Sequence, residues 1–231
     1  MSSSSNYYKA YEERYKAVHR KGLLWEIDEP SKIVLDTINE NHIKGKILDL
    51  GCGEGRDIRY LLDKGYDVLG IDYSISAINK CNEITDNRYL NSFRQFDIFK
   101  DKLDDKFDFI YSIAVIHMFV LQTDRDKYYK FINEHLADDG LALILSMGDG
   151  NTVRETDINE AFELGNREVK GKMVEVTKTS CKMVDWNAYQ KEIESNHLQI
   201  VKKKLVEDVP GFNNMMAVLV KKKWNKDLMK M

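Results

Sequence analysis

The sequence feature that most constrains the fold is a glycine-rich turn directly after a short apolar run. Residues 46–50 form the run, and the glycines of the turn alternate with other residues, at Gly51, Gly53 and Gly55. A second apolar run, residues 67–71, ends at Asp72. This order predicts a strand, a tight turn, a helix and a second strand whose carboxylate can bind ribose hydroxyls. Such a unit is one half of a nucleotide-type cofactor site.

The residues around the glycines favour one cofactor class over another. A dinucleotide-binding turn ends in a third small residue that lets helix and strand pack closely, but this chain has Arg56 there. Asp49 lies two residues before Gly51. A carboxylate there is unfavourable beside a diphosphate and suitable near an ammonium and a sulfonium. The turn therefore points to S-adenosylmethionine (SAM) rather than NAD.

Length and composition indicate a globular protein. The 231 residues are enough for one large domain, or for one domain with attached helices. The net charge of −3 provides no overall basic field for nucleic acid. The three cysteines (Cys52, Cys81 and Cys181) are far apart, lack metal-ligand spacing and suggest a reducing compartment. Without an apolar run long enough for a bilayer or a signal peptide, we expect a cytoplasmic protein with no membrane partner.

Strand-like and helix-like segments alternate from residue 46 onward. The strand-like runs are residues 46–50, 67–71, 90–96, 107–113 and 141–146. The helix-like segments between them are residues 56–64, 74–84 and 124–136. Alternation with short links predicts a parallel sheet with helices on both faces. Residues 198–206 and 215–222 predict a final antiparallel pair at the sheet edge, joined by a Pro210-Gly211 turn.

The two ends of this core have their own patterns. Residues 7–20 and 31–41 are predicted to be helical, the first because Tyr8, Tyr11 and Tyr15 recur at helical spacing. After the fifth strand, a polar segment at residues 149–168 suggests a helix, and residues 173–181 alternate like a strand. A further helix is predicted from Asp185 to Asn196.

The ordered motifs resemble those of class I SAM-dependent methyltransferases. The matching stretches are Asp-Leu-Gly-Cys-Gly-Glu-Gly-Arg-Asp at 49–57, Gly-Ile-Asp-Tyr-Ser at 70–74, Phe-Asp-Ile at 96–98, Phe-Asp-Phe-Ile-Tyr-Ser at 107–112, and residues 136–146 around Asp139-Gly140. The resemblance covers roughly residues 45–147, and the ordered set is more specific than any single motif. It implies an α/β, Rossmann-like doubly wound sheet, mostly parallel with an antiparallel edge strand. It also implies a helical N-terminal extension or lid at 1–44, a methyltransferase domain at 45–224 and a tail at 225–231. Residues 149–184 would be a substrate-covering insertion.

The resemblance also implies roles for residues at the cofactor. The glycine turn, with Gly51, Cys52, Gly53 and Gly55, would line the methionine end of SAM, and Asp49 would orient that turn. Asp72 would accept hydrogen bonds from both ribose hydroxyls, and Tyr73 would cover the adenine. Asp97 would accept from the adenine amino group beside the apolar Ile98. Ser112 and Ile113 would end the fourth strand at the crevice. An alternative for Asp97 is a loop-capping or helix-capping carboxylate.

Candidate acceptor residues lie outside these motifs. His117 follows the fourth strand and could contact substrate, act as a base or be a buried structural histidine. The segment with Tyr8, Tyr11, Tyr15 and Trp25 could close over the site as a lid, or these could be packing residues. A cluster of charged residues follows the fifth strand and could form an acidic rim that favours a cationic amine, or could face solvent. It consists of Asp149, Arg154, Glu155 and Asp157.

The proposed chemistry is direct displacement, in which an acceptor nucleophile attacks the methyl carbon of SAM. The sequence after the fourth strand, Ser112-Ile113-Ala114-Val115, lacks the Asn/Asp-Pro-Pro-Tyr/Phe motif of enzymes that methylate adenine or glutamine amino groups. The chain also lacks a Pro-Cys nucleophile and the spacing of a metal site. We therefore expect a small-molecule acceptor, no nucleic acid and no metal. An RNA or protein methyltransferase, or a non-catalytic SAM-binding module, is the alternative.

Overall fold

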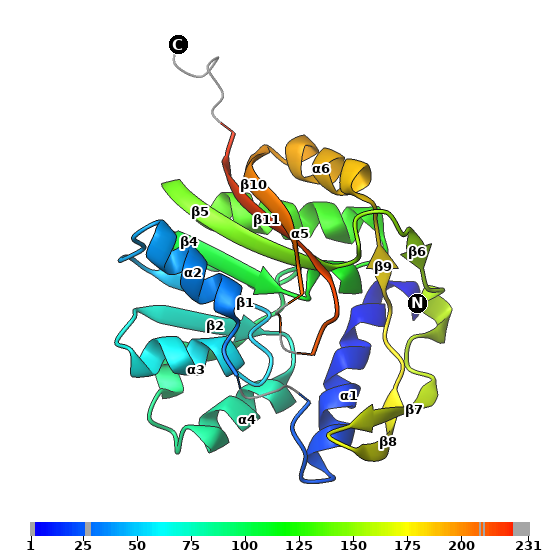
Figure 1. The fold of residues 1–231 in the computed structure, drawn as a ribbon. Helices are drawn as coiled ribbons and strands as arrows, with labels where there is room; N and C mark the ends of the chain where they lie inside the picture. Colours follow the sequence, from blue (N-terminus) through cyan, green and yellow to red (C-terminus); the bar gives the residue numbers. More distant parts are fainter. Residues whose placement is uncertain (1–2, 26–28, 208, 210, 224–231) are drawn as a thin grey trace.

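The computed structural model describes residues 3–25, 29–207, 209 and 211–223. Within them, a central sheet has seven strands in the order β10-β11-β5-β4-β1-β2-β3 (Figure 1). The strands are β1 (Ile47–Leu50), β2 (Val68–Asp72), β3 (Phe93–Gln95), β4 (Phe107–Ile113), β5 (Leu136–Met147), β10 (Leu198–Val206) and β11 (Met215–Lys222). Strands β1 to β5 pair in parallel, whereas β11 is antiparallel to β5 and β10 is antiparallel to β11. The predicted sheet, parallel with an antiparallel edge, is confirmed.

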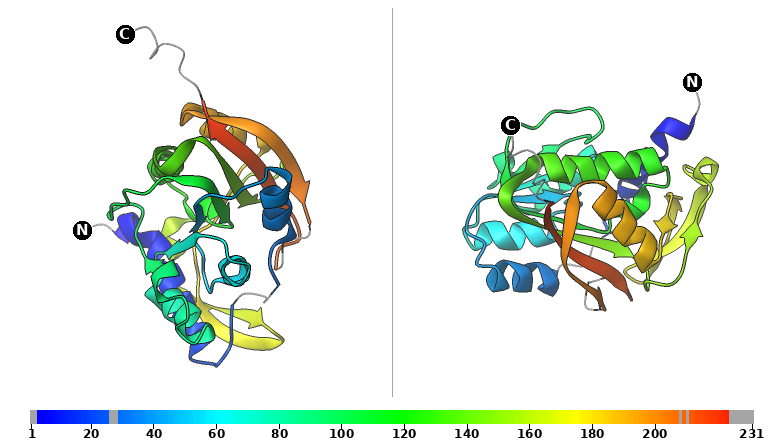
Figure 2. Two further views of the ribbon diagram at one scale, coloured as in Figure 1. Left: turned by 90° about the vertical axis from the view of Figure 1, so that its left-hand side faces the viewer. Right: turned by 90° about the horizontal axis from the view of Figure 1, so that it is seen from above.

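Helices cover both faces of the sheet (Figure 2). They are α2 (Lys32–Glu40), α3 (Arg56–Asp63), α4 (Ile75–Ile84), α5 (Gln122–His135) and α6 (Trp186–Ser195). Because side chains alternate along a strand, β4 sends Phe109 and Tyr111 into the core under α2, α3 and α4. Ile110, between them, enters the core under α5 and α6. This two-sided burial is the reason that the strands read as nearly continuous apolar runs.

The insertion after β5 is where the sequence-based prediction was wrong. Residues 149–168 do not form a helix; their helical part is one short 3₁₀ turn, Ile158–Glu160. Instead β6 (Arg154–Glu155) pairs with β9 (Lys182–Met183), and β7 (Leu164–Val169) forms an antiparallel hairpin with β8 (Lys172–Thr177). Lys170 and Gly171 both have positive φ, as a two-residue hairpin turn requires.

Two strand boundaries also differ from the prediction. Strand β3 is shorter than predicted, because Leu90–Ser92 form a 3₁₀ turn before it. Strand β5 is longer, because pairing with β4 already begins at Leu136. Residue 210 of the predicted Pro210-Gly211 turn and the predicted tail at 225–231 lie outside the described residues.

The N-terminal segment lies along the edge of the insertion (Figure 1). A 3₁₀ turn, Ser3–Lys9, leads into α1 (Ala10–His19). Val18 of α1 packs against the alternating valines of the hairpin, which are Val169, Val174 and Val176. The apolar face of β8 is therefore covered by α1 rather than by the main sheet. Among the residues that the structure describes, none of the helices combines the length and apolar character needed to cross a bilayer.

Candidate active site

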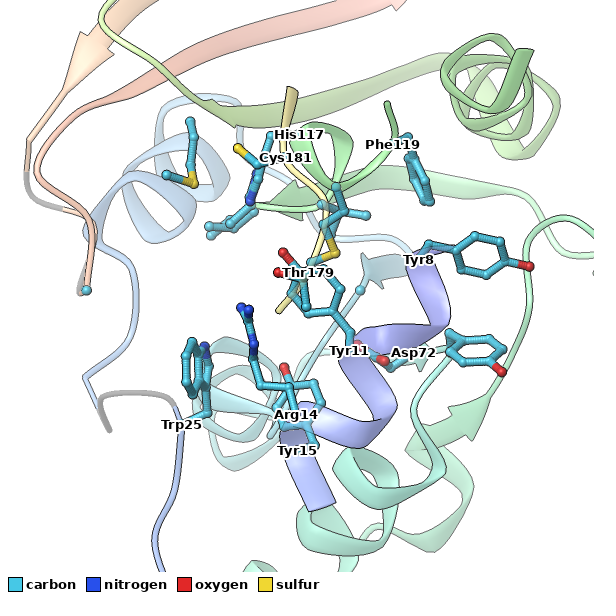
Figure 3. Close-up of a pocket in the computed structure, with 18 of the residues that line it drawn as sticks. Tyr8, Tyr11, Arg14, Tyr15, Trp25, Asp72, His117, Phe119, Thr179 and Cys181 are labelled. Atoms are coloured by element: carbon cyan, nitrogen blue, oxygen red, sulfur yellow. The ribbon is translucent and has the colours of Figure 1, made fainter. Parts of the chain in front are cut away.

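A cavity of about 700 Å³ lies at the carboxyl ends of the parallel strands, between the sheet, α1 and the insertion (Figure 3). It adjoins β1, where the strand order reverses: β2 and β3 lie on one side of β1, and β4 and β5 lie on the other. Open parallel sheets bind ligands at such a switch point. Of the residues predicted to bind cofactor, those that line the cavity are Gly51, Asp72, Tyr73, Asp97, Ile98 and Ile113. The predicted acceptor residues that line it are Tyr11, Tyr15, Trp25 and His117.

The glycine turn forms the floor of the cavity. Gly51 has φ +82° and borders Val115 so closely that an added Cβ would collide with that side chain. A Cβ on Gly55, with φ +80°, would come within 2.9 Å of Cys81 Sγ. The amide groups of Gly51 and Cys52 donate to Ile71 O (2.8 and 3.0 Å), which ties the turn to β2. Glycine is therefore required for both the bend and the close approach.

Other predicted cofactor residues support the floor from behind. Asp49 is buried and accepts a hydrogen bond from Tyr111 Oη (2.9 Å). Ser112 Oγ donates to Leu50 O (2.9 Å), so it braces β1 from within the sheet. Cys52, Gly53 and Gly55 are also buried in the turn rather than lining the cavity. The structure thus places these residues in a supporting layer.

Asp72 lies at the end of β2, where its carboxylate joins two loops. Oδ2 accepts from Gly53 N (2.9 Å) and Oδ1 accepts from Ser74 N (2.8 Å). Burial raises the pKa of Asp72 to about 6, although both backbone hydrogen bonds lower it. Each carboxylate oxygen has more than one acceptor site, so both can still accept a ribose hydroxyl. The residues present therefore fit an adenosyl ligand.

Asp97 and its aromatic neighbours form the other end of the cavity. Asp97 Oδ1 accepts from Phe99 N (3.0 Å), which is the loop-capping role considered above. Its Oδ2 accepts from Tyr8 Oη (3.2 Å). The Tyr8 ring lies edge-on to Tyr73 and Phe99, with centroids 5.5 and 5.0 Å apart. Tyr8 belongs to the tyrosine stripe that the helical spacing marked, whereas sequence reasoning missed Phe99 as a lining residue.

The N-terminal segment makes hydrogen bonds to all three cofactor motifs. Tyr8 contacts Asp97, as described above, and Glu12 Oε1 accepts from Ser76 Oγ (2.8 Å) beside the Asp72 loop. At the glycine turn, Glu54 Oε1 accepts from Trp25 N (2.9 Å) and lies 2.6 Å from His19 Nε2. The segment therefore lies against all three motifs of the predicted SAM site.

His117 sits in a rigid turn at the end of β4. The 3₁₀ turn Ile116–Met118 is held by Arg125, whose Nη1 donates to Ile116 O (2.8 Å) and Phe119 O (3.1 Å). The imidazole is buried, and its Nδ1 has no hydrogen-bond partner among the described residues. Burial, with smaller effects of Arg125 and Arg14, lowers the pKa of His117 to about 3. The side chain is therefore neutral at pH 7 and able to take part in a hydrogen bond.

The Arg125 side chain that holds this turn is itself fixed by a buried ion pair. Arg125 is fully buried and makes two hydrogen bonds to Glu192 of α6, Nε–Oε1 at 2.9 Å and Nη2–Oε2 at 2.7 Å. Removing one partner leaves the other charge buried without compensation, which costs about 3–5 kcal/mol. Glu192→Ala is thus expected to lower the free energy of unfolding by this amount in urea titration. Glu194→Ala, on an exposed site of the same helix, serves as the control. An equal effect of both variants would contradict the clamp.

The acceptor side of the cavity differs from the predicted acidic rim. Asp149 accepts from Asn151 N (2.9 Å) and Thr152 N (2.7 Å), and these hydrogen bonds lower its pKa to about 2. Its carboxylate caps its own loop and does not line the cavity. Asp157 caps its own turn in the same way, while Glu155 pairs with Lys182. The assignment of Asp149 to substrate binding therefore gains no support from this geometry.

Basic and small polar residues line most of that side, together with one carboxylate, Glu168. They are Arg14, Arg154, Thr156, Arg167, Lys170, Thr179 and Cys181. Arg14 lies between the rings of Tyr11 and Trp25, 5.2 and 5.0 Å from their centroids, and its Nε donates to Thr177 O (3.1 Å). These residues come from α1 and the insertion. No local spacing in the sequence marks them as a set.

Comparisons with known proteins agree with this fold. The family model described as "Tellurite resistance protein TehB" matches residues 26–189. A Haemophilus influenzae protein named "Probable S-adenosyl-L-methionine-dependent methyltransferase TehB" is 36% identical over 102 residues, which cover 44% of this chain and 35% of that protein. The aligned part is thus about a third of that relative's length.

Two solved structures show the same fold over nearly the whole chain. A SAM-dependent methyltransferase of Clostridium acetobutylicum has a TM-score of 0.65 at 19% identity, covering 94% of this chain and 99% of that one. The 1,6-didemethyltoxoflavin-N1-methyltransferase of Burkholderia thailandensis has a TM-score of 0.72 at 13% identity, covering 97% and 92%. The Rossmann-like prediction is therefore confirmed.

Proposed function

The chain belongs to the TehB family, and from this premise we propose that it transfers the methyl group of SAM to a small-molecule acceptor. The relatives and structural neighbours described above are named SAM-dependent methyltransferases, and one was crystallised with S-adenosylhomocysteine. One observation carries the proposal: a single cavity joins Gly51, Asp72 and Asp97 to a further space beside His117. An adenosyl ligand would occupy the first part and an acceptor the second.

The residues have distinct tasks in the proposed reaction. Bound SAM supplies a methyl group on a sulfonium, and the acceptor attacks that carbon while the carbon–sulfur electron pair stays on sulfur. Asp72 would orient the ribose and Asp97 the adenine, so the reactive carbon is held in place. The lid segment and the insertion would exclude water. Alignment and exclusion of water account for most of the acceleration when the cofactor is already activated.

We propose His117 as the residue nearest to the acceptor chemistry. Its imidazole is neutral at pH 7 and its buried Nδ1 has no partner among the described residues, so it can take part in a hydrogen bond with the acceptor. With a pKa of about 3 it would be a weak base toward an acceptor that arrives protonated. An acceptor that arrives deprotonated would need only the hydrogen bond. A space beside His117 also favours an enzyme over a non-catalytic SAM-binding module, which would not need it.

The coverage of the cavity favours a small acceptor. Residues 1–44 would act as the lid and 149–184 as the insertion of a methyltransferase domain spanning 45–224. Tyr8 and Arg14 of the lid, and Arg167 of the insertion, line the same cavity. A folded protein or an RNA helix would have to displace these elements before it reached His117. This geometry favours the small-molecule proposal over an RNA or protein acceptor.

Calorimetric titration with SAM and S-adenosylhomocysteine tests the proposed function. We expect saturable binding with one site per chain, and methyl transfer from radiolabelled SAM to a compound in a metabolite extract. The absence of binding to both ligands would reject the proposal. Binding without transfer to any extract would favour the SAM-binding module.

The pKa of Asp72 predicts how SAM binding depends on pH. Its pKa is raised from 3.8 to about 6 in the folded chain, so the carboxylate is protonated below that pH. Because ribose hydroxyls bind the ionised form, SAM affinity is expected to fall about tenfold per pH unit below pH 6. The stability of the ligand-free fold has the opposite pH dependence. Because the folded carboxyl has the higher pKa, it contributes most to the free energy of unfolding at low pH, and this contribution is lost as the pH rises from about 4 to 6. Titrations from pH 5 to 8 check the first effect. Asp72→Asn should remove it, and a dependence that survives this change would contradict the assignment.

A further inference from the structure

The charges of the cavity are divided between its two parts. Asp72 and Asp97 lie at the predicted cofactor end, whereas Arg14 of α1, Arg154 of β6 and Arg167 of β7 line the acceptor end. We call these three residues the arginine cluster. Arg56 lines the cavity too, but it is paired with Asp57 at 3.0 Å. The acceptor end is therefore lined by positive charges, whereas the cofactor end is lined by carboxylates.

The three guanidinium groups act on the same small region. The charge of Arg167 lowers the pKa of Arg14, so the two groups are close enough to repel each other. Arg154 and Arg167 both lower the pKa of Cys181, although burial raises it overall. Ser180 Oγ donates to Met118 O (2.7 Å), which places this part of the insertion against the turn that carries His117. The cluster and the proposed chemistry thus share one space.

No carboxylate of the described chain neutralises the cluster. No ion pair joins Arg14, Arg154 or Arg167 to an acidic side chain in residues 3–25, 29–207, 209 and 211–223. Glu168 and Lys170 also line the cavity and add one charge of each sign. Arg14 is 6% exposed, and a cation this buried is costly unless it has an anionic partner. Figure 3 shows Arg14 projecting from α1 beside Trp25 into the cavity.

The surroundings of Arg14 indicate which kind of anion fits. The Tyr11 and Trp25 rings flank its guanidinium, while its Nε is held by Thr177 O. The planar group is therefore fixed, and its two Nη groups have no partner among the described residues. A fixed guanidinium matches a carboxylate, which it can bind through two parallel hydrogen bonds. The Tyr11 and Trp25 rings beside the guanidinium suit an organic body attached to that carboxylate.

We infer that the acceptor is an organic carboxylate whose anionic group binds the arginine cluster while its nucleophilic atom faces His117. This inference rests on the proposed function and adds the chemical class of the acceptor. Two other anions could bind the same arginines: the methionine carboxylate of SAM itself, and an inorganic oxyanion such as tellurite. The experiment below distinguishes these two anions from an acceptor carboxylate.

Benzoate and benzamide provide a matched pair of probes, since they share a ring and differ in charge. Each is titrated into the complex with S-adenosylhomocysteine, with tryptophan fluorescence as the readout. We expect saturable benzoate binding at least about tenfold tighter than benzamide binding. Arg154→Gln and Arg167→Gln alter exposed residues, so folding should persist, and each is expected to weaken benzoate binding about tenfold. Arg20→Gln, outside the cavity, should leave it unchanged.

Four results would overturn the inference. Equal binding of benzoate and benzamide, or benzoate binding that both arginine variants leave unchanged, would exclude a carboxylate site at the cluster. Tighter binding of tellurite than of benzoate would assign the cluster to an inorganic oxyanion. Loss of S-adenosylhomocysteine affinity in the arginine variants, with unchanged affinity for the carboxylate-free methylthioadenosine, would assign it to the cofactor. If S-adenosylhomocysteine itself fails to bind the unaltered chain, the proposed function fails before the inference is reached.

Discussion

Asp72→Ala is expected to raise the Kd for SAM by about 100-fold. The carboxylate would accept hydrogen bonds from both ribose hydroxyls, and a hydrogen bond to a charged group contributes about 1.5–3 kcal/mol. The variant also leaves Gly53 N and Ser74 N without their side-chain acceptor, which loosens the turn that forms the cavity floor. Isothermal titration calorimetry with SAM and S-adenosylhomocysteine measures the change.

Asp108→Asn is the matched control for this measurement. Asp108 lies at the start of β4, far from the carboxyl ends of the strands, and the asparagine keeps an acceptor for Lys46 N. Its SAM affinity should equal that of the unaltered chain. If Asp72→Ala binds SAM as tightly as this control, Asp72 does not belong to the cofactor site.

The second large effect is expected at His117. His117→Ala should lower kcat by about 10²- to 10⁴-fold if the imidazole takes the proton of the acceptor, because this is the usual contribution of a positioned base. SAM affinity should stay within about twofold, since the adenosyl contacts lie at Asp72 and Asp97. Rates of methyl transfer at saturating SAM, with calorimetric Kd values, separate the two quantities. The low pKa of His117 also means that its own ionisation should leave the rate unchanged between pH 5 and 8.

Two controls distinguish chemistry from folding. His42→Ala removes an exposed imidazole after α2 and should not change kcat. Thermal unfolding of His117→Ala shows whether loss of a buried side chain destabilises the turn at Ile116–Met118. A normal kcat in a folded His117→Ala protein would leave this residue with only a structural role.

The fold was predictable from sequence because its signals are local. The runs that became β4, β10 and β11 have the predicted bounds. Apolar residues of β4 and β11 enter the two cores, whereas β10 is an edge strand with only Leu198 and Val206 buried.

The insertion was predicted less well. Its polar residues allowed a helix, but the alternation of Val174 and Val176 is satisfied by pairing with β7 and covering by α1. Because α1 lies far from this hairpin in sequence, residues 149–168 carry no local signal of the packing.

The site residues also differ in whether a local sequence pattern marks them. The glycine turn and Asp72 could be recognised because strand, turn and helix follow each other in sequence, and they meet at one cavity edge. The assignments of individual site residues stay predictions that the variants above test. Asp149 looked accessible in the sequence, but hydrogen bonds within its own loop occupy its carboxylate. Arg14 and Arg167 carried no recognisable pattern, because they are 153 positions apart and meet only across the hairpin.

Local sequence specified the doubly wound sheet and the position of its glycine turn, because adjacent residues encode a strand, a bend and a helix. The arginine-lined end of the cavity had no such local code. Packing of α1 against the insertion brings together side chains that have no fixed spacing, and burial then sets their charge and partners. Backbone geometry depends on a few neighbouring residues, whereas the chemistry of a cavity depends on contacts between distant ones.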